Sequence, residues 1–212
     1  MSNVRDLRQE FKALYTASSK TAALVEVPAL SYLMIDGRGD PNAAPEYQQA
    51  IEALYALSYT LKFHFKRSAQ AIDYPVMALE GLWSVVNLRD LANRDKWEWT
   101  MMIMQPEWVT RDLVSEMGVQ VARKKPLAAL TKVRLEEFEE GLAAQILHIG
   151  PYATEWPTIE RLHRYVHDNG YELHGKHHEI YLSDPRRAAP EKLKTILRHP
   201  VRKAGTPEEH AR

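Results

Sequence analysis

The chain has no cysteine, no long hydrophobic run and no excess of charge of either sign. Because it has no thiol, it can form no disulfide, thiolate zinc site, iron–sulfur cluster or cysteine nucleophile. Lysine plus arginine number 28, as do aspartate plus glutamate, so the formal net charge is zero. A neutral chain has no general attraction to nucleic acid or to an anionic membrane, and we expect neither as a partner.

Targeting and membrane-spanning signals are also missing from the sequence. No apolar run approaches the length of about 18 residues that a membrane span needs, and the start, MSNVRDLRQE, is too polar for a signal peptide. We therefore expect a cytoplasmic protein. The chain, 1–212, is 45% hydrophobic, which fits one large domain or two intimately packed halves.

The first half of the chain alternates between β and helical patterns. A short amphipathic helix is predicted within residues 5–18, and a long β stretch over 22–40, where Pro28 marks a bulge or an edge. Residues 46–66 carry apolar side chains at helical spacing, which predicts a long helix. Two apolar segments then predict the strands of a hairpin, 74–86 and 96–106.

The second half repeats this order after a connecting region. Residues 107–125 predict a helix with Thr110 as its cap, and a strand is expected around Leu130–Leu135, followed by an acidic turn. The repeat then comprises a strand, a helix and a pair of strands that turns at Gly175, over residues 141–152, 154–170 and 171–185.

Strand, helix, strand, strand thus occurs twice, with Gly37 and Gly150 at matching points. This predicts an α+β fold made of duplicated strand–helix–strand–strand units, with a cleft between the two equivalent sheets. The repeat halves extend roughly over 22–105 and 128–184. The basic C-terminal tail, 185–212, is expected to lie over the surface, with its last residues partly disordered.

An aromatic strand offers the first candidate for ligand binding. The alternation of side chains puts Trp97, Trp99, Met101 and Ile103 on one face of this strand. Two neighbouring tryptophans can form the wall of a pocket for a flat or cationic molecule, or they can fill a core. The pattern does not decide between these two interpretations.

A second strand places a carboxylate beside a tyrosine. Ile180 and Leu182 share the face that suits packing under helices, so Glu179 and Tyr181 share the opposite face with His177. If Glu179 is exposed, it is a solvated charge. If aromatic side chains enclose it, its pKa rises and it becomes a base or a partner for a cation.

The strand EGLW brings a further carboxylate close to an aromatic residue. Glu80 and Leu82 share one face of this strand, and Gly81 and Trp83 share the other. A glycine inside a strand marks either a bulge or the close approach of a ligand or another backbone.

Motifs for metals and cofactors are missing. His163 and His167 have the spacing of a zinc-binding HExxH helix, but Arg164 stands where that motif needs glutamate. The other histidine group, at 174–178, has no suitably spaced carboxylates. No GxxxxGK[ST], GxGxxG or GxSxG motif occurs. We therefore expect no metal and no cofactor.

Five segments are informative in combination: VEVPALSYLMIDGRGDPN, YPVMALEGLW, KWEWTMMIMQP, LHIGPYATEWPTIERLH and HHEIYLSDPRRAAPEKLKTILRHPV. Together they resemble the GyrI-like small-molecule-binding family, and more narrowly its stand-alone members, which carry no DNA-binding domain. The likeness runs from about Val25 to Val201. It implies duplicated units in a pseudo-twofold arrangement with a central ligand cleft.

The resemblance also implies a function and a site. Family members act as effector domains of multidrug-sensing regulators that bind hydrophobic and often cationic aromatics. Some stand-alone members are reported as hydrolases that open the cyclopropane ring of DNA-alkylating cyclopropanoid compounds. The family's cavity glutamate corresponds to Glu179, and its aromatic lining corresponds to Trp97, Trp99 and Tyr152. Because the sequence has no helix-turn-helix, the resemblance to the regulators implies only their capacity to bind ligands.

Two functional hypotheses follow. In the first, the protein is a hydrolase in which Glu179 is the base, Tyr152 or Tyr181 donates a hydrogen bond to a developing phenolate, and the two tryptophans hold the ligand. In the second, the same residues only bind or sequester a hydrophobic or cationic aromatic molecule. Under both hypotheses, Glu80 and Trp83 are expected to be further ligand-binding residues. A scaffold with a vestigial cleft is a third interpretation. The residues are identical under the first two, so the sequence does not separate them.

Overall fold

The computed structural model describes residues 3–85, 87, 89 and 92–205. In this part of the chain, nine strands form one antiparallel sheet. Its order is β2 (Ala23–Val27), β8 (Gly141–Ile149), β11 (Lys194–Lys203), β10 (His177–Tyr181), β5 (Leu79–Val85), β6 (Trp97–Gln105), β3 (Leu30–Arg38) and β7 (Arg134–Phe138), with β9 (Tyr171–Leu173) paired to the end of β11. A small parallel pair joins β1 (Asn3–Val4) and β4 (Ile72–Asp73).

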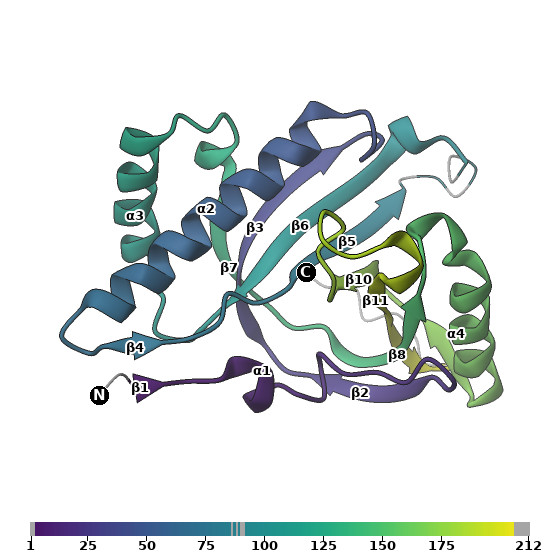
Figure 1. Cartoon of the computed structure of the whole chain (residues 1–212). Coiled ribbons are helices and arrows are strands. Elements are labelled where there is room, and N and C mark those ends of the chain that lie inside the picture. Colours follow the sequence, from purple (N-terminus) through teal and green to yellow (C-terminus); the bar gives the residue numbers. More distant parts are fainter. Residues whose placement is uncertain (1–2, 86, 88, 90–91, 206–212) are drawn as a thin grey trace.

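Four α-helices complete the described fold: α1 (Leu7–Glu10), α2 (Pro45–Arg67), α3 (Arg111–Lys124) and α4 (Trp156–Asp168). Helix α2 lies over β3 and β6, α4 lies against β8 and β11, and α3 packs beside α2 (Figure 1). The predicted long helix is confirmed, and Thr110 caps α3 by accepting a hydrogen bond from the backbone N–H of Leu113. None of the helices in the described ranges is long and apolar enough to cross a membrane.

The strand order supports the predicted duplication. In the first half, β3 comes first in the chain, α2 follows, and β5 and β6 form the order β3-β6-β5. In the second half, β8, α4, β10 and β11 give the corresponding order β8-β11-β10. The two halves meet where β5 pairs with β10. The predicted α+β class and hairpin 74–106 are therefore confirmed, with β5 and β6 as the hairpin strands.

In the first half, the glycine of the turn is Gly39, two residues after the predicted Gly37. Gly37 lies inside β3, where it pairs with Trp99 of β6, and it makes no turn. The turn after β3 contains Gly39, with φ of +105°, and the turn after β8 contains Gly150, with φ of +140°. These backbone conformations favour glycine because a side chain would be strained there.

Several predicted strand boundaries were wrong for identifiable reasons. The stretch 22–40 forms two strands in different parts of the sheet, because Pro28 has no N–H to continue a ladder. The expected strand near Leu130–Leu135 starts later, and β7 includes the segment predicted as an acidic turn. The predicted hairpin over 171–185 does not form, because β9 pairs with β11. The helix expected within 5–18 is a single short turn, α1.

The largest correction concerns the C-terminal tail. Residues 194–203 form β11, which lies between β8 and β10 in the middle of the sheet. Ile196 and Leu197 are fully buried, and even Arg198 is buried. The lysines and arginines of this segment obscured its apolar pattern in the sequence. Because β11 belongs to the second repeat half, that half extends beyond the predicted 184.

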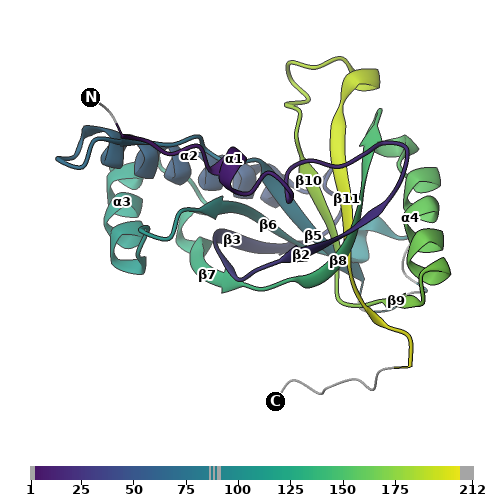
Figure 2. The ribbon, with the colours of Figure 1, turned by 90° about the horizontal axis from the view of Figure 1, so that it is seen from below.

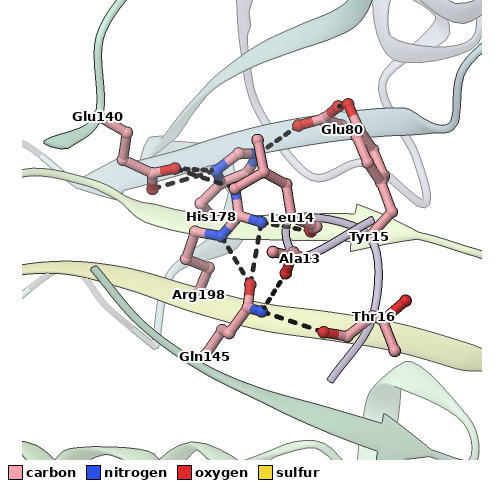
Figure 3. A network of polar contacts seen from close by, with 9 residues as sticks. All are labelled: Ala13, Leu14, Tyr15, Thr16, Glu80, Glu140, Gln145, His178 and Arg198. Atoms are coloured by element: carbon pink, nitrogen blue, oxygen red, sulfur yellow. Dashed lines mark hydrogen bonds and ion pairs between the residues drawn. The ribbon is translucent and has the colours of Figure 1, made fainter. Parts of the chain in front are cut away.

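A buried polar network lies on the face of the sheet opposite α2 and α4. Figure 3 shows its residues. His178 is held between two carboxylates, with its Nε2 3.0 Å from Glu80 and its Nδ1 3.0 Å from Glu140. Arg198 donates a hydrogen bond to the same Glu140 carboxylate. Two carboxylates and two cations therefore face one another in a site closed to solvent.

The same network fastens the N-terminal segment to the sheet. Figure 2 shows this segment, in purple, running past α1 towards β2. Tyr15 donates a hydrogen bond of 2.6 Å to Glu80, and Arg198 donates one to the carbonyl of Leu14. Gln145 donates hydrogen bonds to the carbonyls of Ala13 and Thr16. The network therefore ties residues 13–16 to β5, β8, β10 and β11.

Ionisation of the network links its stability to pH. Burial alone would lower the pKa of His178, but Glu140 and Glu80 outweigh it and raise this pKa from 6.5 to about 9. For Glu140, burial opposes ionisation, yet His178 and Arg198 lower its pKa from 4.5 to about 2. The stabilisation from His178 is complete below pH 6.5 and disappears as pH rises through 9. That from Glu140 is complete above pH 4.5 and disappears as pH falls towards 2.

We predict that His178→Gln lowers the free energy of unfolding at pH 6 by roughly 3–5 kcal/mol, because it leaves the buried Glu80 carboxylate without its cation. The variant should also lose the decline in stability that the wild type shows between pH 6.5 and 9. Denaturant unfolding at both pH values measures this. The exposed His174→Gln serves as the control and should match the wild type. A His178→Gln variant with the wild-type pH profile would contradict the assignment of the charge to His178.

Candidate functional site

Glu179 lies in the middle of a row of side chains that crosses the sheet. The register of the strands aligns it on one face with residues of five neighbouring strands, Ile146, Leu197, Gly81, Met101 and Ile35. This is the face that α2 and α4 cover, since Ser58 of α2 is hydrogen-bonded to Gln105 on it and Leu162 of α4 packs with Ile146 and Leu197. The prediction that Glu179 points away from the helix-covered face was wrong. Both faces are covered, and Ile180 points towards the buried network.

A chain of hydrogen bonds holds the Glu179 carboxylate. Tyr181 donates a hydrogen bond of 2.8 Å to Glu179, and the indole N–H of Trp83 donates one of 3.1 Å to the Tyr181 hydroxyl. The Nε2 of His177 lies 3.3 Å from the other carboxylate oxygen. The side chain of Glu179 is 15% exposed, so it is largely desolvated but still reachable.

Gly81 makes this arrangement possible. It is the residue directly opposite Glu179 on β5. A Cβ atom on Gly81 would lie 2.9 Å from the Trp83 indole nitrogen and 3.2 Å from the Tyr181 hydroxyl oxygen. The strand contains glycine here because two side chains cross over its backbone, rather than because of a bulge.

Aromatic rings from four parts of the chain (α2, the β5–β6 hairpin, the turn after β8, and β10) form a connected group beside this carboxylate. We call it the aromatic cluster: Tyr47, Trp83, Trp97, Tyr152 and Tyr181. Tyr47, on α2, has its ring centroid 6.0 Å from that of Trp83. Trp83 and Trp97 lie 5.8 Å apart, and Tyr152 meets Tyr181 edge-on at 5.7 Å. Most of these contacts are edge-to-face or tilted, which is the favourable geometry for aromatic pairs.

A second carboxyl group, Glu155, belongs to the same site. It immediately precedes α4, it is 5% exposed, and its Oε1 has no hydrogen-bond partner among the described residues. Burial raises the pKa of Glu155 from 4.5 to about 9, and the charge of Glu179 adds to this rise. Glu179 exerts that effect only when it is ionised. At neutral pH the site therefore holds a neutral carboxyl at Glu155 close to the Glu179 carboxylate.

The tyrosines of the cluster keep their protons. Burial raises the pKa of Tyr181 well above its usual range, and the charge of Glu179 raises it further. Burial, followed by Glu155 and Glu179, raises the pKa of Tyr152 to about 12. Both phenols are therefore hydrogen-bond donors at neutral pH.

Not all of the predicted site residues come together. Tyr181, Trp83 and Tyr152 are linked to Glu179 by the contacts described above, and Trp97 joins this group only through its ring contact with Trp83. Glu80 lies on the opposite face, 1% exposed, in the network with His178, so it does not join them. Glu80 pairs with Ile180, the residue after Glu179, so the alternation of side chains puts Glu80 and Glu179 on opposite faces of the sheet.

Trp99 lies beneath the cluster and is 2% exposed. Its ring covers Gly37, where an added Cβ would lie 2.0 Å from the Trp99 ring, and Tyr47 makes an edge-to-face contact with it at a centroid distance of 5.3 Å. In the described structure Trp99 supports the rings that surround Glu179. Its predicted contact with ligand stays a prediction.

Sequence reasoning missed Tyr47 and Glu155. Tyr47 stands four residues before Ile51 in the helical pattern of α2, so its place on the inner face was available from the spacing. Glu155 follows the glycine turn in GPYATEWP, three residues after the predicted Tyr152. Its burial depends on the packing of α4 against the sheet, which local sequence does not reveal.

Three histidines, on α4, β10 and β11, lie together, and His177 of β10 is the one beside Glu179. The rings of His163 and His177 each lie within 5.8 Å of the ring of His199. Burial lowers the pKa of His199 to about 3, with His177 and His163 contributing, so His199 is neutral. Within the described ranges, no group of three or more histidine, aspartate or glutamate side chains is arranged to hold a metal ion.

A family model matches most of the chain. The model of a family described as a GyrI-like small molecule binding domain matches residues 22–202. A comparison with curated proteins finds no significant match.

Solved structures resemble the chain over almost its whole length. One is an uncharacterized conserved protein from Listeria innocua, 39% identical, with a TM-score of 0.86, covering 93% of this chain and 99% of that one. A structure described as a hydrolase from Listeria innocua is 37% identical, with a TM-score of 0.82 and the same coverage. Another, also described as a hydrolase from that organism, is 37% identical, with a TM-score of 0.85, covering 95% of this chain and 100% of that one.

We predict that Gly37→Ala destabilises the fold by about 1–3 kcal/mol, because the new methyl group would overlap the Trp99 ring and push it towards Tyr47. Unfolding followed by tryptophan fluorescence measures both the stability and the displacement. Gly118→Ala on α3 is the matched control, because a Cβ there meets nothing within 4 Å. It should stabilise the helix by about 0.5–1 kcal/mol. Equal stability of Gly37→Ala and the wild type would show that Trp99 does not lie against Gly37.

Proposed function

This chain belongs to the GyrI-like small-molecule-binding family, and we propose that it binds flat, hydrophobic and often cationic aromatic molecules beside Glu179. The observation that carries the proposal is a carboxylate, 15% exposed, set among the rings of the aromatic cluster. Such a carboxylate attracts a lipophilic cation by charge, and the ring faces add cation–π attraction of about 0.5–2 kcal/mol. We place the ligand cleft between α2 and α4, where the two pseudo-twofold-related halves meet.

We further propose that the protein hydrolyses cyclopropanoid alkylating compounds. Two relatives at 37% identity are described as hydrolases, and they cover nearly the whole chain. The pairing of an ionised carboxyl with a neutral one also suits such chemistry, because enzymes assign base and acid roles to carboxyl groups in this way.

The proposed reaction adds one water molecule to a cyclopropane conjugated with a dienone. The water oxygen bonds to the ring methylene while a ring C–C bond breaks, and that electron pair moves through the dienone to the carbonyl oxygen. Glu179 takes the proton of the attacking water as general base, which is worth roughly 10²–10⁴-fold in rate. The carbonyl oxygen becomes a phenolate, which Tyr152 stabilises by hydrogen bonding and Glu155 protonates.

The alternative function is binding or sequestration without chemistry. It is supported by the tyrosine hydrogen bond to Glu179, since Tyr181 occupies one carboxylate oxygen at 2.8 Å. A carboxylate held in this way can serve as a fixed counter-charge for a cation. The two functions differ in one outcome, which is whether ring-opened product exceeds the amount of protein.

We predict that Glu179→Gln lowers the rate of cyclopropanoid hydrolysis by at least ~10²-fold, because the amide keeps the shape of the side chain but is not a base. Affinity for a neutral aromatic ligand should change little, whereas affinity for an aromatic cation should fall. Chromatography of the ring-opened product and calorimetric titration measure these effects. Glu191→Gln, an exposed glutamate on the loop before β11, is the matched control.

Two outcomes would overturn parts of this proposal. Turnover by Glu179→Gln at the wild-type rate would exclude Glu179 as the base. Tight binding by the wild type without any product in excess over protein would exclude hydrolysis of the tested compound and favour sequestration.

A further inference from the structure

His148, near the end of β8, is a buried histidine that the proposed reaction does not use. It is 6% exposed. Its Nδ1 lies 3.1 Å from the hydroxyl oxygen of Thr158 on α4, and its Nε2 lies 3.3 Å from the backbone carbonyl oxygen of Pro151. One ring therefore joins the end of the strand to both ends of the segment 151–158, which leads into α4.

The two partners fix the tautomer of this ring. A carbonyl oxygen only accepts hydrogen bonds, so the Nε2 of His148 carries the proton that it donates to Pro151. In the neutral ring Nδ1 is then the acceptor, and the hydroxyl of Thr158 donates to it. The other tautomer would set a lone pair against the carbonyl oxygen. His148 is therefore held in one orientation.

The segment that His148 holds begins with a tight turn. Gly150 has a φ of +140°, and its N–H donates a hydrogen bond to the carbonyl of Leu193. A Cβ atom on Gly150 would lie 3.2 Å from the Nε2 of His148, so the ring lies directly against the backbone of the turn. The hydroxyl and the N–H of Thr154 also donate to the Pro151 carbonyl, at 2.8 and 2.9 Å. Three donors thus converge on one carbonyl oxygen.

The held segment carries two groups of the Glu179 site. Tyr152 and Glu155 both lie between the two residues that His148 contacts. The ring of Tyr152 meets that of Tyr181, which donates the hydrogen bond to Glu179. Glu155 is 5% exposed, and the charge of Glu179 contributes to the rise in its pKa. The contacts of His148 therefore determine where both groups stand relative to Glu179.

We propose that His148 is a positioning residue that fixes the segment between β8 and α4, so that Tyr152 and Glu155 stay beside Glu179. The proposal rests on the proposed function, because these two groups would stabilise and protonate the phenolate oxygen. His148 acts through them and takes no part in making or breaking bonds. If the segment were loosened, water would reach Glu155, its carboxyl would ionise at neutral pH, and the site would lose its acid.

The variant His148→Leu tests the proposal, because it fills the same space without either ring nitrogen. The pKa of Glu155, followed by carbon-13 NMR, should fall from about 9 towards 4.5. The hydrolysis rate should fall by roughly 10²-fold, the cost of misplacing reacting groups by about 1 Å. Affinity for an aromatic cation, which Glu179 attracts, should change far less than the rate. The exposed His174→Leu is the control and should change none of these quantities.

Two further variants separate the contacts of the ring. His148→Gln keeps an N–H donor for the Pro151 carbonyl, so it should retain more of the rate than His148→Leu. Thr158→Val keeps the shape of its side chain but removes the hydroxyl that donates to Nδ1, and it should lower the pKa of Glu155 in the same direction. Added to His148→Leu, Thr158→Val should have little further effect, because the contact is already lost.

An unchanged titration of Glu155 in folded His148→Leu would overturn the proposal, since a lower melting temperature alone is the mark of a merely structural role. If His148→Leu does not fold, Thr158→Val takes its place, and an unchanged pKa of Glu155 in that variant is equally decisive. A wild type that forms no product in excess over protein would contradict the proposed hydrolysis instead. The titration of Glu155 would still decide the role of His148.

Discussion

The pairing of β10 with β5 is the constraint on which the rest of the structure depends. It joins the two halves of the sheet, and its register decides where two neighbouring side chains go. His178 points to one face, where it is held between Glu80 and Glu140. Glu179 points to the other face, into the aromatic cluster. A slip of one residue would exchange these faces and bury the wrong charge on each side.

The buried network and the candidate site lie on opposite faces of β10, so the contacts of each help to fix the position of this strand for the other. On the first face, His178 and Arg198 neutralise two carboxylates and hold the N-terminal segment over the sheet. Removing one member of such a set leaves an unpaired buried charge, which is costly. On the second face, the absence of a side chain at Gly81 lets Tyr181 and Trp83 meet beside Glu179. Because side chains pack on both faces of β10, this strand holds the Glu179 carboxylate in place.

The sequence predicted local patterns well and long-range placement poorly. The helical spacing of α2, the hairpin of β5 and β6 and the repeated order of elements depend on local periodicity, and they were found. Strand β11 was missed because its lysines and arginines concealed the apolar residues that fill the middle of the sheet. Glu80 was expected among the ligand-binding residues although its strand position puts it on the face opposite Trp83. The burial of Trp99 depends on Gly37 of another strand. The burial of Glu155 depends on the packing of α4 against the sheet, which the local sequence does not reveal.

The central claim is that Glu155 keeps its proton at neutral pH in a desolvated site beside Glu179. Carbon-13 NMR of glutamate-labelled protein measures the ionisation of side-chain carboxyl groups directly, and the variants Glu155→Gln and Glu179→Gln assign the two signals. The account predicts that Glu155 keeps its proton at pH 7 and titrates near a pKa of about 9. It also predicts that Glu179→Gln lowers the pKa of Glu155, because a nearby negative charge is removed. A Glu155 that is ionised at pH 7, or whose titration ignores Glu179→Gln, would contradict it.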